Sequence, residues 1–169
     1  MMGPWGERPT EVANLLNPAF AGALLRLSLD GYAREARSGM AFELAFLVLP
    51  ICLHPGTTSR MPVSPSTTPI HAWLQRDANR DVLISFPERL RSLVPFTREA
   101  ILFAAQRGVV SIDDGGLLRA GPSRLRGITA YRNSGVEVRE AARRAEFTGR
   151  WFALSGTTST IFTLFGIRP

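Results

Sequence analysis

The stretch TREAILFAAQRGVVSIDDGGLLRA, residues 97–120, changes its hydrophobic period halfway along. Up to Gly108 the apolar residues recur at helical spacing, with Thr97 as the expected N-cap and the glycine as a stop signal. After this glycine, two short apolar runs flank Asp-Asp-Gly-Gly, which predicts a β-hairpin over 109–119. The two aspartates are expected to form the turn and not a metal site.

Helical segments are predicted on both sides of this stretch. Asn17-Pro18 is an N-cap followed by proline at the first helical position, so a helix is expected to run from there to about Arg37. Further helices are predicted over 41–53, from 69 to about 77, over 86–94 with a break at Pro95, and over 136–154 and 158–165. Two helices followed by a hairpin are typical of a winged helix. The expected fold class is therefore mainly α, a compact helical domain with a β-hairpin wing.

The chain has 169 residues, 45% of them hydrophobic, which predicts a single compact domain over 1–169. Residues 1–10 are expected to be flexible, and the Ser/Thr/Pro-rich residues 55–69 to form a connection without a helix. The apolar run 44–53 falls short of the roughly 18 to 20 residues that span a bilayer, so no membrane contact is expected. A single cysteine and the lack of a signal-peptide core predict a cytoplasmic protein.

The positive charge lies in the second half of the chain. All 20 basic residues are Arg, and the net charge is +6. Residues 1–85 contain 7 Arg and 7 acidic residues, whereas residues 86–169 contain 13 Arg and 7 acidic residues. Without lysine no Walker A motif exists, so ATP hydrolysis by a P-loop is excluded.

Two sets of residues are candidates for contacts. The first is a basic stripe beside the hairpin, which would meet nucleic acid or an acidic protein partner, or remain a solvated charged loop: Arg98, Arg107, Arg119, Arg124, Arg126 and Arg132. The second set, near the C-terminus, is a candidate docking surface for a protein partner, although its aromatic members would also suit a core: Arg139, Arg143, Arg150, Trp151, Phe162 and Phe165. On the long helix, Glu140 with Arg144 and Glu146 with Arg150 are expected to pair at i,i+4.

No catalytic, cofactor or metal site is predicted. His54 and His71 fall outside every zinc-binding spacing and are expected to be a helix-end cap or surface residues. Cys52, in an apolar run without a basic neighbour, is expected to be a small core residue. A small hydrolase would need an unrecognised site around one of the two histidines.

Five motifs and the predicted hairpin together resemble the middle component of bacterial three-component ABC systems, the Lamassu type of anti-phage defence among them. The motifs are NPAF (17–20), LAFLVLPICLH (44–54), LVPFTREAILFAAQRG (93–108), GRWFA (149–153) and IFTLFGIRP (161–169). The resemblance implies a non-catalytic adaptor subunit that docks on an SMC- or Rad50-like ABC ATPase and couples it to an effector protein, often a nuclease, with any DNA contact secondary. It supplies no catalytic residues. The alternative is a free-standing winged-helix regulator that binds DNA.

Overall fold

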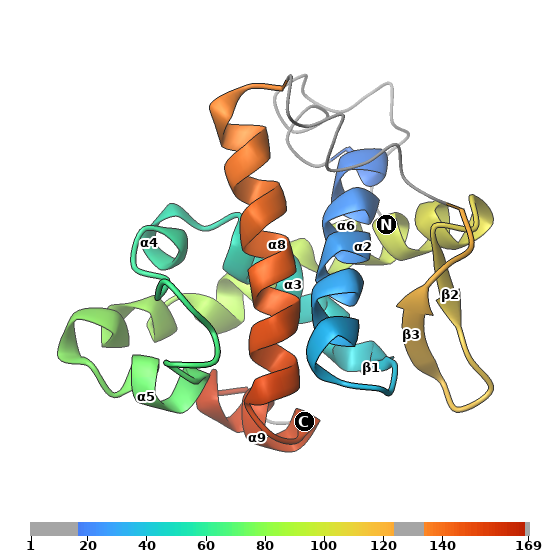
Figure 1. Cartoon of the computed structure of the whole chain (residues 1–169). Helices are drawn as coiled ribbons and strands as arrows, with labels where there is room; N and C mark the ends of the chain where they lie inside the picture. The colour runs from blue at the N-terminus through green and yellow to red at the C-terminus, as the bar shows by residue number, and fades with distance from the viewer. Residues whose placement is uncertain (1–16, 124–133, 168–169) are drawn as a thin grey trace.

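The computed structural model describes residues 17–123 and 134–167, and this part of the chain is mainly helical with a small three-stranded antiparallel sheet (Figure 1). The sequence predicted this fold class. The flexibility expected of residues 1–10 lies outside the described residues. In chain order the elements are α2 (Pro18–Glu35), β1 (Met40–Ala41), the 3-10 helix η2 (Phe42–Leu44), α3 (Ala45–Cys52), α4 (Pro55–Thr58), α5 (Ile70–Leu74), the 3-10 helix η3 (Asp77–Leu83), α6 (Phe86–Gln106), β2 (Val110–Ile112), β3 (Leu117–Ala120), α8 (Val136–Leu154) and α9 (Thr158–Leu164).

Helix α2 is the central packing element, because both α6 and α8 pack against it. It begins as predicted: the Asn17 side chain accepts a hydrogen bond from the Ala19 amide at 2.8 Å, and a proline follows the cap. Glycines allow a very close approach of α2 to α8. A Cβ on Gly149 would lie 1.8 Å from the Ser28 carbonyl oxygen, and one on Gly31 would lie 2.1 Å from that of Glu146.

The sheet has the strand order β1-β3-β2, so the predicted hairpin pairs with a strand from the first part of the chain. Met40 is opposite Leu118 across the β1–β3 pair. The sequence prediction of one helix over 41–53 is wrong at its start, since Ala41 belongs to β1 and the α-helix begins only at Ala45. Ala41 lies in a strand because β1 pairs with β3, which is far away in the sequence.

Helix α6 continues through Pro95, so the predicted break there is wrong. The proline lacks the N–H that would bond to the carbonyl of Arg91. Thr97, the expected N-cap, is instead buried in the middle of the helix, and its hydroxyl donates to the Leu93 carbonyl at 3.0 Å. Burial of Phe86 at one end and of Ala100 and other apolar residues at the other holds both halves of α6 in the core.

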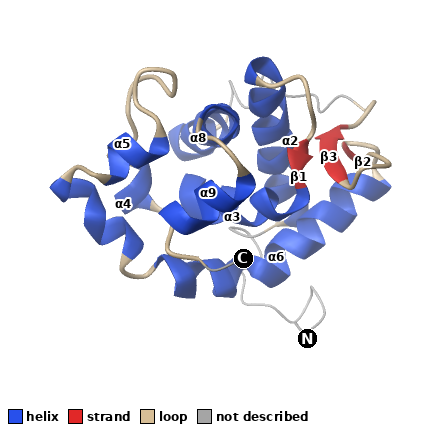
Figure 2. Ribbon diagram, turned by 90° about the horizontal axis from the view of Figure 1, so that it is seen from below, coloured by secondary structure: helices blue, strands red, loops and turns tan. Residues whose placement is uncertain are grey.

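The segment between α3 and α6 packs against the C-terminal helices. Trp73 of α5 meets Trp151 of α8 edge to face at 5.2 Å, and directly after this segment Phe86, the first residue of α6, stacks on Phe165 at 4.6 Å. Both views place α4 and α5 at the opposite end of the molecule from the sheet (Figure 2). The connection predicted to have no helix contains the single turn α4, capped by His54.

Candidate interaction surface

The hairpin is fixed to α2 by a largely buried arginine, Arg26. Its Nη1 donates to the carbonyl oxygens of Val109, Gly121 and Ser123 at 2.9 to 3.0 Å, and its Nε donates to Asp30 at 3.0 Å. These carbonyls lie just before β2 and just after β3, so one guanidinium holds both ends of the hairpin. The partners are 83 to 97 residues away, and sequence analysis had no local signal for them.

The turn of the hairpin is built around Asp113, as the sequence predicted. Its carboxylate accepts hydrogen bonds from the amides of Gly115 and Leu117 at 3.0 Å and from Arg119 Nε at 2.6 Å. The Leu117 amide, followed by the Arg119 guanidinium, lowers the pKa of the Asp113 carboxyl below its usual value. Arg119 is therefore engaged within the hairpin, and Asp114 leaves an exposed carboxylate at the tip.

The predicted basic stripe is only partly described. Arg98 and Arg107 are both exposed on the C-terminal half of α6 and at its end. Arg98 has no ion pair or hydrogen bond with any residue that the structure describes, and the guanidinium of Arg107 lies over the Phe103 ring at 5.0 Å. The other three stripe residues, Arg124, Arg126 and Arg132, lie outside the described residues. The stripe as a continuous face thus stays a prediction.

The arginines proposed as docking residues on α8 take part in ion pairs. Glu140 pairs with Arg144 at 3.7 Å as predicted, and also with Arg143 at 2.5 Å. The predicted pair of Glu146 with Arg150 is wrong, because each binds a residue of α2 instead. Glu146 pairs with Arg34, and Arg150 Nη2 lies 2.6 Å from Glu35. The α2–α8 contact, absent from a local reading of the sequence, supplies these partners. Arg139 also has an interaction partner.

The aromatic docking candidates lie in the core. Trp151 and Phe165 are both 0% exposed, and the Trp151 indole N–H donates to the Thr68 carbonyl at 2.8 Å. Phe162 is half-buried against the same core. The side chains of Trp151 and Phe165 therefore offer no surface to a partner, because Trp73 of α5 packs on Trp151 and Phe86 of α6 stacks on Phe165.

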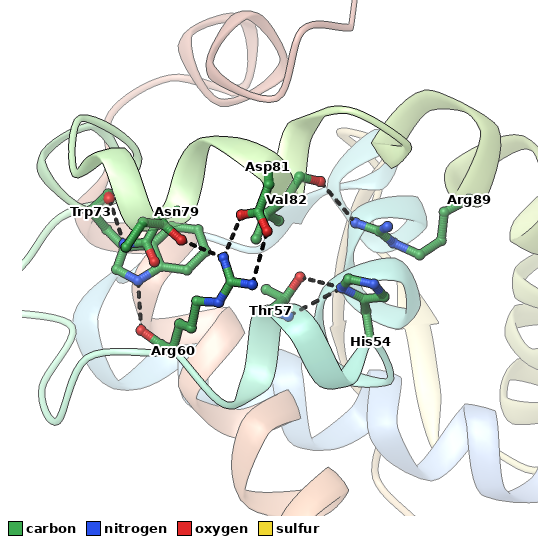
Figure 3. A network of polar contacts seen from close by, with 9 residues as sticks. His54, Thr57, Arg60, Trp73, Asn79, Asp81, Val82 and Arg89 are labelled. Atoms are coloured by element: carbon green, nitrogen blue, oxygen red, sulfur yellow. Dashed lines mark hydrogen bonds and ion pairs between the residues drawn. The ribbon is translucent and has the colours of Figure 1, made fainter.

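A second polar cluster joins the segment between α3 and α6 to its neighbours (Figure 3). Arg60 forms a double ion pair with Asp81, with Nη2 and Oδ2 2.9 Å apart. The Arg60 carbonyl accepts from the Trp73 indole at 2.7 Å, and the Trp73 carbonyl accepts from Asn79 at 2.8 Å. From α6, Arg89 donates to the carbonyls of Pro50 and Val82. The cluster links these elements to one another, and no local sequence pattern predicted it.

His54 has the geometry of a helix cap, one of the two roles expected of it. Its Nδ1 accepts from the Thr57 amide at 3.1 Å and lies 2.8 Å from the Thr57 hydroxyl. The ring nitrogen that could act as a base is thus occupied by the cap, and Thr57 is 0% exposed. His71 is exposed on α5. Burial raises the pKa of the Cys52 thiol to about 12, which disfavours the thiolate that a nucleophile needs.

The described residues contain no group of three or more His, Cys, Asp and Glu side chains placed to hold a metal ion. Within the same residues, no helix combines the length and the apolar character needed to cross a bilayer.

Comparison with known proteins gives one match. The family model described as "ABC-three component (ABC-3C) system Middle Component 3" matches residues 5–169. Neither a curated protein nor a solved structure matches the chain.

Proposed function

The chain belongs to the Middle Component 3 family of ABC-three component systems, and we propose that it is a non-catalytic adaptor within such a system. In this role it docks on an SMC- or Rad50-like ABC ATPase and couples it to an effector protein, for instance a nuclease. The system is a cytoplasmic defence system of the Lamassu type. The family match over 165 residues is the observation that carries the proposal.

The side chains support an adaptor over an enzyme. The histidine with the most polar surroundings, His54, caps a helix, and the buried cysteine has a raised pKa. The larger polar clusters use their groups to join segments of this chain, as Arg26 and Arg60 do. The surface of the described residues is therefore the part of the chain left to carry a function. A protein that works through its surface binds a partner.

We also propose that α2, β1, α3, α6 and the β2–β3 hairpin form a winged-helix unit. The order helix, strand, helix, helix, hairpin supports this, as does the strand order β1-β3-β2, in which the first strand pairs with the last. In this unit α6 takes the position of the recognition helix and β2–β3 that of the wing. The segment carrying α4, α5 and η3 is then an insertion between the second and third helices.

A free-standing DNA-binding regulator is the second candidate. It is favoured by Arg98 and Arg107, which lie exposed on α6 without an acidic partner among the described residues. The hairpin tip favours the adaptor: Asp113 and Asp114 place two carboxylates where a wing would meet phosphates, and Arg119 is bound to one of them.

Co-expression with the products of the two flanking genes tests the adaptor proposal. We expect the three chains to co-purify as one assembly that persists at micromolar concentration. The regulator instead predicts that the isolated chain binds duplex DNA with a steep salt dependence, and that R98A and R107A weaken this binding. Tight DNA binding by the chain alone, without assembly, would favour the regulator.

A further inference from the structure

The exposed face of α6 is the surface whose composition is least explained by the fold. Arg91, Pro95, Arg98, Leu102 and Ala105 are all exposed, and their spacing of three or four residues places them along one stripe of the helix. The opposite side of α6 is in the core. There, Ala100 and Ala104 lie so near α2 that a Cβ on Gly22 would be 3.2 Å from the Ala104 Cβ.

Leu102 is the apolar centre of this stripe. The residue is 63% exposed in the last two turns of α6, between the buried Ile101 and Ala104. A single exposed leucine is ordinary in a soluble protein. Here, however, Pro95 and Ala105 extend the apolar surface along the same stripe, one or two turns to either side. An apolar strip of this kind is the pattern that an amphipathic helix uses for recognition.

The charged residues of the stripe itself are Arg91 and Arg98, whereas Glu99, three residues before Leu102, is half-buried and has an interaction partner. Most of the described arginines have a carboxylate partner, such as Arg34 with Glu146 across two helices. Arg98, one turn before Leu102, has no partner among the described residues, and Arg107 contacts only the Phe103 ring in that part of the chain. Arg91 has only a long pair with Glu88, at 3.6 Å between two exposed side chains. An exposed pair at this distance contributes little and exchanges readily for a better partner.

We propose that this α6 face, defined by Arg91, Pro95, Arg98, Leu102 and Ala105, binds an acidic amphipathic helix of a protein partner. The inference rests on the proposed adaptor function and assigns it a surface. Apolar residues of the partner helix pack on Leu102 and on Pro95, which lie about two turns apart on either side of Arg98. Carboxylates of the partner helix pair with Arg91, one turn before Pro95, and with Arg98, one turn before Leu102. The guanidinium fork donates hydrogen bonds to both oxygens of a carboxylate at once, which fixes the register of the two helices.

Two substitutions on this face and two matched controls test the proposal. L102D places a carboxylate where the apolar contact forms, and R98E reverses the unpaired charge. The controls are V63D, at a valine that is 103% exposed in the connection after α4, and R76E, at an exposed arginine next to η3. The measurement is the Kd of each labelled chain for the purified assembly of the two flanking gene products. An unchanged thermal melt verifies that each variant is folded.

We expect L102D and R98E each to raise the Kd at least about tenfold, since L102D places an unpaired carboxylate in the apolar contact and arginines are among the residues that dominate binding energies. The Kd of each control variant should remain within about twofold of that of the wild-type chain. Added salt should weaken the wild-type complex more than the R98E complex, because the variant has lost the attractive charge.

Three results would overturn the proposal, and they are distinguishable. If the wild-type chain binds but L102D and R98E bind equally well, the partner docks elsewhere and the adaptor function stands. If the two variants lose binding to duplex DNA while the protein assembly is intact, the α6 face contacts nucleic acid. If the wild-type chain binds neither flanking gene product, the adaptor function itself is wrong, and this surface assignment fails with it.

Discussion

Among single residues, Arg26 makes structural contacts that its sequence context does not predict. It looks like one arginine among twenty, yet its guanidinium reaches the carbonyls at both ends of the hairpin. Hydrogen bonds from a charged donor are stronger than those between neutral groups, and these are partly shielded from water. The position of the proposed wing relative to α2 therefore depends on this one side chain.

Replacing Arg26 by methionine is expected to lower the free energy of unfolding by about 2 to 3 kcal/mol, because the carbonyls of Val109 and Gly121 lose their charged donor. Urea denaturation measures the loss. The matched control is R37M, at an exposed arginine with no ion pair among the described residues, and its effect should stay within about 0.5 kcal/mol. Equal effects of the two substitutions would show that the Arg26 contacts are not structural.

His54 connects stability to pH. Burial, followed by the charges of Arg89 and Arg60, lowers its pKa below the ordinary 6.5. The unfolded chain therefore binds the proton more tightly than the folded chain, and protonation favours unfolding. Since Nδ1 accepts the Thr57 amide hydrogen, protonation also removes the cap. The contribution of the neutral ring is complete above pH 6.5 and is lost as the pH falls below this value through the lower pKa of the folded chain.

We therefore expect the melting temperature to rise between about pH 5 and pH 7, and the H54N variant to show a smaller rise, because asparagine caps a helix without titrating. Thermal melts monitored by circular dichroism across this range measure the effect. H71N removes an exposed imidazole and serves as the matched control. A rise that is as steep in H54N as in the wild-type chain would assign the pH dependence to other groups.

At the scale of elements, the crossing of α2 and α8 fixes much of the rest of the structure. Two glycines let the backbones of the two helices approach each other. Ion pairs of Arg34 and Arg150 link the helices beside this contact. A side chain larger than hydrogen at Gly149 must push the helices apart, since its Cβ would lie 1.8 Å from a backbone oxygen. The helices carry the core contacts of Trp151 and Phe152, so these would move too.

The variant G149A is therefore expected to lose at least about 2 kcal/mol of stability, although alanine is the better helix former. G135A is the matched control, because a Cβ there meets nothing within 4 Å, and its cost should not exceed about 1 kcal/mol. Chemical denaturation of both variants gives the comparison. A G149A variant as stable as the wild-type chain would mean that the helices cross at a greater distance.

Element types were predictable from sequence where the signals are local. Asn17 with the following proline, Asp113 in the turn, and the period change after Gly108 each act within a few residues, and the structure contains the helix, turn and strands that they indicate. Pro95 shows the limit. Its helix-breaking tendency, about 3 kcal/mol, is smaller than the gain from burying both halves of α6 in the core, so the helix continues.

At the scale of the whole molecule, sequence analysis located the charges but not their partners. Glu146 and Arg150 have ideal spacing for a pair on one helix, yet both bind α2. From their residue types alone, Trp151 and Phe165 fit either a docking surface or a core. The packing of α5 and Phe86 against them shows that they belong to the core. The interaction surface could not be read from sequence, because exposure and pairing depend on contacts between distant segments. Leu102, which the sequence places in a helix, becomes notable only through its exposure.

The proposed adaptor joins an ABC ATPase to an effector. To measure this, the flanking-gene ATPase is immobilised, and retention of the flanking-gene effector is compared with and without this chain at micromolar concentration. We expect the effector to be retained only when the chain is present, and its retention to fall when L102D replaces the wild-type chain. Equal retention of the effector in the absence of the chain would show that the chain is not an adaptor.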